Sequence, residues 1–82
     1  MRFIEVKGRA SGAATVTVSK NEILTGLNKP EEFILAIVEV DGDKTKIVYL
    51  KRPFVQAPDI SATSINYNID DLLRYAEIVY QD

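Results

Sequence analysis

The chain contains neither cysteine nor histidine among its 82 residues. Without cysteine it forms no disulfide and offers no thiolate to zinc, and without histidine it lacks the commonest transition-metal ligand and general base. Its longest apolar run, Phe33–Val38, is six residues, far shorter than a membrane span, and the first residues hold no secretory hydrophobic region. Any chemistry must therefore use carboxylates, lysine, hydroxyls or the backbone, and we expect a cytoplasmic protein with no membrane partner.

Charge of either sign is also limited, with 12 acidic residues against 10 basic ones and a net charge of −2. A free-standing DNA-binding domain usually has a basic stripe, whereas the basic residues here are scattered along the sequence. If the protein contacts DNA, we expect other domains of a longer parent to supply most of the affinity. An apolar fraction of 46% is typical of a folded protein, and we treat residues 1–82 as a single small domain.

The first predicted strand, Arg2–Lys7, carries the clearest pointer to chemistry. Its alternation predicts that Ile4 and Val6 enter the core. Glu5 and Lys7 then emerge together on the other face, where a carboxylate could bind a divalent cation and an ammonium could steady a water nucleophile or a developing phosphoryl charge. Glu-x-Lys is also common on solvated sheet faces, so the triplet alone leaves a metal site and a charged surface as alternatives.

A second strand, a helix and a central strand follow. Ala14–Val18 alternates as a half-buried strand does, and Ser19 with Glu22 has the spacing of a capping box, which predicts a helix from this point to Asn28–Pro30. Phe33–Val40 is apolar at nearly every position, as in a strand covered on both faces. The short helix predicts a right-handed crossover that places this strand parallel to the first.

The second half predicts a hairpin, a loop and a final helix. Asp41–Asp43 is a turn signal, and Thr45–Leu50 should return as the antiparallel partner of the central strand. Pro53–Ser64 is expected to be loop. Asn68 should cap a helix whose apolar stripe runs from Ile69 to Tyr80. The predicted fold is therefore α/β (α+β), a small mixed sheet with flanking helices in the order β-β-α-β-β-α.

Three blocks of this sequence, Phe3–Arg9, Val16–Glu22 and Phe33–Leu35, resemble those of a known family, the protein NO VEIN C-terminal domain. The resemblance covers most of the chain, including Ser64–Tyr67. The family is a domain of unknown function found at the end of large plant proteins and in many prokaryotic proteins. It often lies beside superfamily 2 or SNF2-type helicase modules, so the resemblance implies helicase domains of a parent protein as partners.

The family in turn resembles the PD-(D/E)xK nucleases, whose restriction-endonuclease-like core places one acid on a strand and a Glu-x-Lys pair on the next. By this resemblance Glu5 is a metal-binding carboxylate, Lys7 is the catalytic lysine, and the Val6 carbonyl is a ligand of Mg²⁺ or Mn²⁺. The chain departs from the pattern because no acid precedes Glu5. We therefore expect it to be the C-terminal portion of a larger nuclease-like domain, and we expect folding to require no metal.

Four further residues are candidates for accessory roles. Arg9, Lys20 and the helix start at Ser19 are candidate phosphate contacts, with surface solvation as the alternative for the two basic side chains. Glu22 is a candidate third polar group at the site, with its capping role as the alternative.

Two functions remain open from the sequence. In the first, the chain belongs to a nuclease-like accessory domain of a DNA helicase or of a restriction or defence protein, which binds DNA through the parent, and these residues alone give no turnover. In the second, a degenerate nuclease scaffold docks partner domains or forms a homodimer through exposed strand edges and the Pro53–Ser64 loop.

Overall fold

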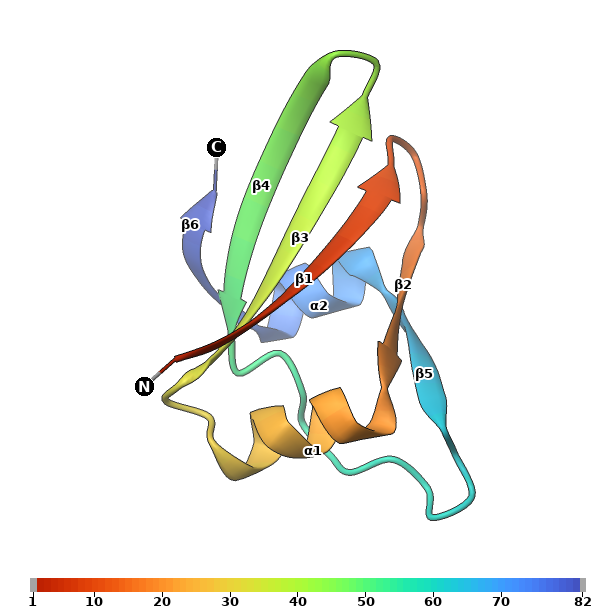
Figure 1. Ribbon diagram of the computed structural model, residues 1–82, viewed down its shortest axis with the longest axis vertical. Coiled ribbons are helices and arrows are strands. Elements are labelled where there is room, and N and C mark those ends of the chain that lie inside the picture. The colour runs from red at the N-terminus through yellow and green to blue at the C-terminus, as the bar shows by residue number, and fades with distance from the viewer. Residues whose placement is uncertain (1, 82) are drawn as a thin grey trace.

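The computed structural model describes residues 2–81, which form a four-stranded sheet, a two-stranded sheet and two helices (Figure 1). The elements are β1 (Phe3–Ala10), β2 (Thr15–Ser19), α1 (Lys20–Asn28), β3 (Phe33–Asp41), β4 (Lys44–Lys51), β5 (Ser64–Asn68), α2 (Ile69–Tyr75) and β6 (Glu77–Gln81). The larger sheet has the order β1-β3-β4-β6, and β2 pairs with β5. This mixed arrangement confirms the predicted fold class.

The larger sheet is built around β3, as the sequence predicts. β1 lies parallel to β3 with Phe3 opposite Phe33, and the connection between them runs through β2 and α1. β4 returns antiparallel after a turn at Gly42, whose φ of 64° favours glycine. β3 has a neighbour on each edge and its first five residues are buried, but the helices cover only one of its faces, so the predicted covering of both faces holds only in part.

α1 begins where the capping box predicts. The hydroxyl of Ser19 accepts a hydrogen bond from the Glu22 N–H at 3.2 Å, and the Glu22 carboxylate accepts one from the Ser19 N–H at 2.8 Å. The helix ends at Asn28, two residues before Pro30. Neither helix of residues 2–81 has the length and apolar character that crossing a bilayer requires.

The hydrophobic core lies on one side of the larger sheet, between it, the two helices and the β2–β5 ribbon (Figure 1). Its buried members are Val16, Val18, Ile23, Phe33, Leu35, Ile37, Leu50, Phe54, Ile69 and Leu72. Phe54 comes from the segment predicted as loop, and its ring centroid lies 5.7 Å from that of Phe33 and 5.3 Å from that of Tyr67. One aromatic side chain therefore anchors the loop in the core.

The last helix is shorter than predicted. α2 ends at Tyr75, and the residues that follow form β6, which pairs antiparallel with β4. Extending the helical stripe to Tyr80 is therefore wrong, because Tyr80 lies opposite Tyr49 with the ring centroids 5.7 Å apart. Strand pairing and this aromatic contact outweigh a weak helical periodicity. β5 was also not predicted.

β1 presents the opposite face to the one predicted. Ile4 and Val6, expected in the core, are 55% and 58% exposed, whereas Glu5 and Lys7 are partly buried on the side covered by the helices. The prediction is wrong because the parallel register sets Glu5 beside Leu35, which is fully buried beneath the helices. A change of one residue in a strand exchanges the two faces, so alternation alone does not decide which set is covered.

Candidate functional site

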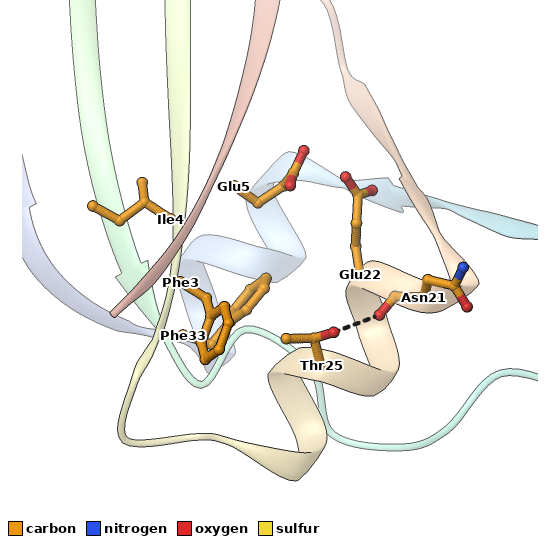
Figure 2. A pocket seen from close by; sticks show the side chains of 7 residues that line it. All are labelled: Phe3, Ile4, Glu5, Asn21, Glu22, Thr25 and Phe33. Carbon is orange, nitrogen blue, oxygen red and sulfur yellow. Dashed lines mark hydrogen bonds between the residues drawn. The ribbon is translucent and has the colours of Figure 1, made fainter. Parts of the chain in front are cut away.

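Glu5, Lys7 and Glu22 lie together between β1 and the first turn of α1. Lys7 Nζ is 2.9 Å from Glu22 Oε1 and 3.6 Å from Glu5 Oε1. Figure 2 shows the carboxyl groups of Glu5 and Glu22 directed toward the same space. The structure thus brings together the predicted pair on β1 and the accessory carboxylate predicted on the helix, which are 15 to 17 residues apart in sequence.

A pocket of about 260 Å³ lies beside these carboxylates (Figure 2). It is lined by Phe3, Ile4, Glu5, Asn21, Glu22, Thr25 and Phe33. Sequence reasoning did not nominate Asn21 or Thr25, although their spacing of four residues places them on one face of α1 beside Glu22. The Thr25 hydroxyl donates to the Asn21 carbonyl at 2.9 Å. The pocket therefore combines an aromatic wall with two carboxylates, whereas the Asn21 amide points away from them (Figure 2).

The two carboxyl groups differ in acidity. Hydrogen bonding to Glu22, with burial and the negative charge of Glu22, raises the pKa of Glu5 above its ordinary value of 4.5. Burial alone would raise the pKa of Glu22, but hydrogen bonds from Glu5, from the Ser19 backbone and side chain and from Lys7 lower it to about 2. Glu22 is consequently the persistent anion of the pair, and Glu5 is the first to take up a proton.

Glu22 belongs both to the helix cap and to this cluster. Its Oε1 accepts from the Ser19 N–H at 2.8 Å and from Lys7 Nζ at 2.9 Å. As the third residue of α1 it reaches back over the helix start, and β1 passes on that side. The capping role and the accessory role are therefore compatible in one side chain, and Ser19 contributes by orienting Glu22.

Val6 has its side chain exposed, but its backbone faces the edge of the sheet next to Glu5. Within residues 2–81, β1 has β3 as its single strand neighbour. The Phe3 N–H donates to the Glu32 carbonyl at 2.9 Å on the β3 side, and backbone groups of successive strand residues point to alternate sides. The N–H and C=O of Val6 therefore point to the open edge, where the carbonyl has no sheet partner among the described residues.

Arg9 and Lys20 make internal contacts elsewhere. Arg9 pairs with Glu39 at 2.5 Å and also donates to the Ala13 carbonyl. Lys20 Nζ donates to the Ile60 carbonyl at 3.1 Å. Neither side chain lines the pocket beside Glu5, so the structure does not bring the two predicted phosphate contacts into this cluster.

No three or more acidic, cysteine or histidine side chains in the described part of the chain gather closely enough to hold a metal by themselves. No curated protein and no solved structure matches the chain. A family model described as "Protein NO VEIN, C-terminal" matches residues 1–50, which include Glu5, Lys7 and Glu22 but not the Ser64–Tyr67 segment. On this match over more than half of its length, the chain belongs to the NO VEIN C-terminal family.

Proposed function

We propose that this chain contributes two carboxylates and a lysine to a metal-dependent phosphodiesterase site of the nuclease class. The observation that carries the proposal is the convergence of Glu5, Lys7 and Glu22 beside a pocket at the open edge of β1. In PD-(D/E)xK nucleases, which the sequence pattern resembles, such a pair serves DNA cleavage, and this likeness supports the proposal. In this proposal a further acidic ligand comes from outside residues 2–81, and the parent is a helicase-associated or restriction-type protein that binds DNA.

The donor atoms suit a hydrated Mg²⁺ or Mn²⁺, which binds one or two carboxylates and keeps waters or substrate phosphate as its other ligands. Glu5 and Glu22 would hold the ion, and the Val6 carbonyl would add a neutral oxygen. The charge of Glu22 contributes to the raised pKa of Glu5, and a cation between the two groups would relieve that repulsion. When bound, such an ion supplies Lewis-acid stabilisation of phosphoryl oxygens.

Lys7 has two tasks in this proposal. Without substrate, its ammonium lies 2.9 Å from Glu22 and 3.6 Å from Glu5 and so offsets the negative charge of the pair. With a phosphodiester in the pocket, the same ammonium would steady an attacking water or the charge that develops on the phosphoryl group. The contact with Glu22 fixes the side chain beside the pocket before substrate arrives.

Glu5→Gln is expected to abolish Mn²⁺ binding by the longer parent protein. The amide keeps the shape of the side chain but removes the charge that holds the ion. Calorimetric titration of Mn²⁺ into wild type and variant measures the effect. Asp43→Asn is the matched control, because it makes the same chemical change at an exposed turn far from the cluster, and it should bind as wild type does. Mn²⁺ binding by Glu5→Gln within twofold of wild type would contradict the proposed ligand.

Metal affinity is expected to increase as the pH rises above 4.5, the ordinary pKa of a glutamate, because the pKa of Glu5 is raised above that value. At lower pH Glu5 is protonated and binds a cation poorly, and ionisation at higher pH restores the ligand. Glu22, with a pKa of about 2, stays charged throughout this range. The Mn²⁺ titration repeated between about pH 4.5 and pH 7 tests this, and a flat profile would argue against Glu5 as a ligand.

The second function, a docking module, is favoured by the open edge of β1. This strand is eight residues long, and the backbone groups of Ile4, Val6 and Gly8 have no strand partner within residues 2–81. An extended segment of a partner protein could add to such an edge. DNA cleavage that survives Glu5→Gln in the parent protein would favour this alternative over the nuclease proposal.

A further inference from the structure

The larger sheet has one apolar face on which no other helix or strand of residues 2–81 packs, although Ile34 and Ala36 on this face are buried. Both helices and the β2–β5 ribbon pack on the other face, and Figure 1 shows β1 and β3 in front of α2. We call the uncovered side the open face. Its exposed apolar side chains are Ile4, Val6, Val40 and Tyr80, with exposed fractions of 55, 58, 46 and 53%, and the partly buried Val38, Ile47 and Tyr49 lie among them.

The open face carries very little charge. Of the residues that its four strands direct to it, Lys51 and Glu77, which lie opposite each other at one end, are the charged ones among those described. The charged residues in the middle of these strands, such as Glu5, Lys7 and Glu39, point to the side of the helices instead. A sheet face in contact with water normally shows the reverse pattern, polar outside and apolar inside. The distribution therefore indicates a face that is covered in the functional protein.

We propose that the open face packs against the open face of a second copy of this chain, with the strands of the two copies antiparallel across a twofold axis. A surface with so little charge can meet its own copy without repulsion between like groups. Two twisted sheets pack face to face at a separation of about 10 Å with strands inclined by about 30°. The proposal goes beyond the phosphodiesterase site, because Glu5 and Lys7 lie on the other side of the sheet.

Charges at the two ends of the open face support the antiparallel arrangement. Arg2 precedes β1 at one end, and Asp43 lies in the β3–β4 turn at the other end (Figure 1). Both are exposed, and neither has an ion-pair partner among the residues that the structure describes. Antiparallel packing places Arg2 of each copy at the end where its partner has Asp43, so two complementary pairs would form at the rim.

The exposed area is also sufficient for a dimer of modest stability. The half-exposed side chains and their partly buried neighbours present an apolar patch on the order of 500 Å², at the upper end of what monomers usually expose. Over the two copies such a patch amounts to about 1,000 Å², the lower limit for a specific interface. We therefore expect association at micromolar concentrations.

The test compares wild type with Val40→Lys by sedimentation equilibrium from about 1 μM to about 1 mM, the range in which such a contact saturates. Wild type should reach the mass of a dimer, and the variant should dissociate at least tenfold more readily. Val40 is about half exposed, so a lysine stem can lie on the monomer surface without disturbing the fold, which circular dichroism checks. Ile60→Lys, at a site 93% exposed and outside the sheet, is the matched control and should associate as wild type does.

Charge exchange supplies a second measurement at exposed positions. Arg2→Glu and Asp43→Lys each place like charges at both ends of the antiparallel dimer, so each alone should associate more weakly. Mixed together, the two variants regain both attractions, and native mass spectrometry should show the heterodimer in excess over either homodimer. A wild-type chain that remains monomeric at the highest concentration overturns the proposal. A Val40→Lys dimer as stable as wild type, or a mixture without preference for the heterodimer, overturns it equally.

Discussion

Gly26→Val is expected to lower the free energy of unfolding by about 1 to 3 kcal/mol or more, the largest stability loss we predict for a single substitution. A Cβ atom at Gly26 would lie 2.7 and 2.9 Å from two ring atoms of Phe54 and 3.2 Å from the ring of Phe33. Both rings are buried and pack on each other, so neither can withdraw without opening the core. Overpacking a core costs about 1 to 3 kcal/mol and sometimes more. A domain of this size has a free energy of unfolding of only about 5 kcal/mol, so such a loss is a large fraction of it.

Urea unfolding followed by far-ultraviolet circular dichroism measures this loss, and Gly8→Val is the matched control. No atom lies within 4 Å of a Cβ built at Gly8, and valine suits the strand in which it lies. We expect the control to keep or raise the free energy of unfolding, by up to about 1 kcal/mol. Gly26→Ala should fall between the two, because its gain in helix propensity of about 1 kcal/mol offsets part of the clash. Equal stability of both valine variants would show that α1 is not fixed against Phe54.

Under the proposed nuclease function, Lys7→Met is expected to separate metal binding from DNA cleavage. The ammonium lies close to both carboxylates and competes with a cation for them, so its removal should tighten Mn²⁺ binding severalfold. Cleavage of DNA by the parent protein should fall at least about a hundredfold, as when other enzymes lose one group that stabilises developing charge. Methionine keeps most of the length of the stem, so the fold should persist.

Calorimetric titration measures Mn²⁺ binding by wild type and Lys7→Met, and a plasmid assay measures DNA cleavage by the parent protein. Lys20→Met is the matched control, since that ammonium contacts a loop carbonyl and does not line the pocket. It should leave both quantities unchanged. Weaker Mn²⁺ binding in Lys7→Met, together with undiminished cleavage, would assign Lys7 a purely structural role.

Local sequence signals predicted the elements that depend on local interactions. The capping box at Ser19 and Glu22 placed the start of α1 because both of its hydrogen bonds lie within four residues. The apolar run from Phe33 identified the central strand, whose first five residues are buried, although the helices cover only one face of its sheet. The crossover rule then gave the parallel pairing of β1 with β3.

Features decided by tertiary packing were not predictable in the same way. Alternation in β1 separates two sets of side chains, but the parallel register determines which set meets the helices. Phe3 lies on the same face of β1 as Glu5 and packs against the core. Its large apolar side chain was the sequence signal that this face is the covered one. Likewise, β6 forms because β4 has an edge that can pair with it and because the ring of Tyr49 packs on that of Tyr80. A helical periodicity in the sequence reports neither interaction.

The candidate site was predictable in its members but not in its geometry. Glu5 and Lys7 were selected from strand alternation. Because residues two apart in a strand are on the same face, they lie close together whichever face of β1 is covered. Glu22 was selected only as an accessory group, since its capping role explained it fully. Its contact with Lys7 depends on how the crossover places the start of α1 beneath β1, which no spacing in the sequence encodes.

The parallel pairing of β1 with β3 bears on how the protein folds. Each residue of β1 is opposite a residue thirty positions later, from Phe3 with Phe33 to Ala10 with Val40, and no other strand of residues 2–81 adjoins it. During synthesis β1 therefore has nothing to pair with until β3 has left the ribosome, whereas α1 and the β3–β4 hairpin can form from neighbouring residues. Because closing long loops is slow, β1 should join the sheet late in folding. The glutamate and lysine that it carries should then be the last of the cluster to arrive.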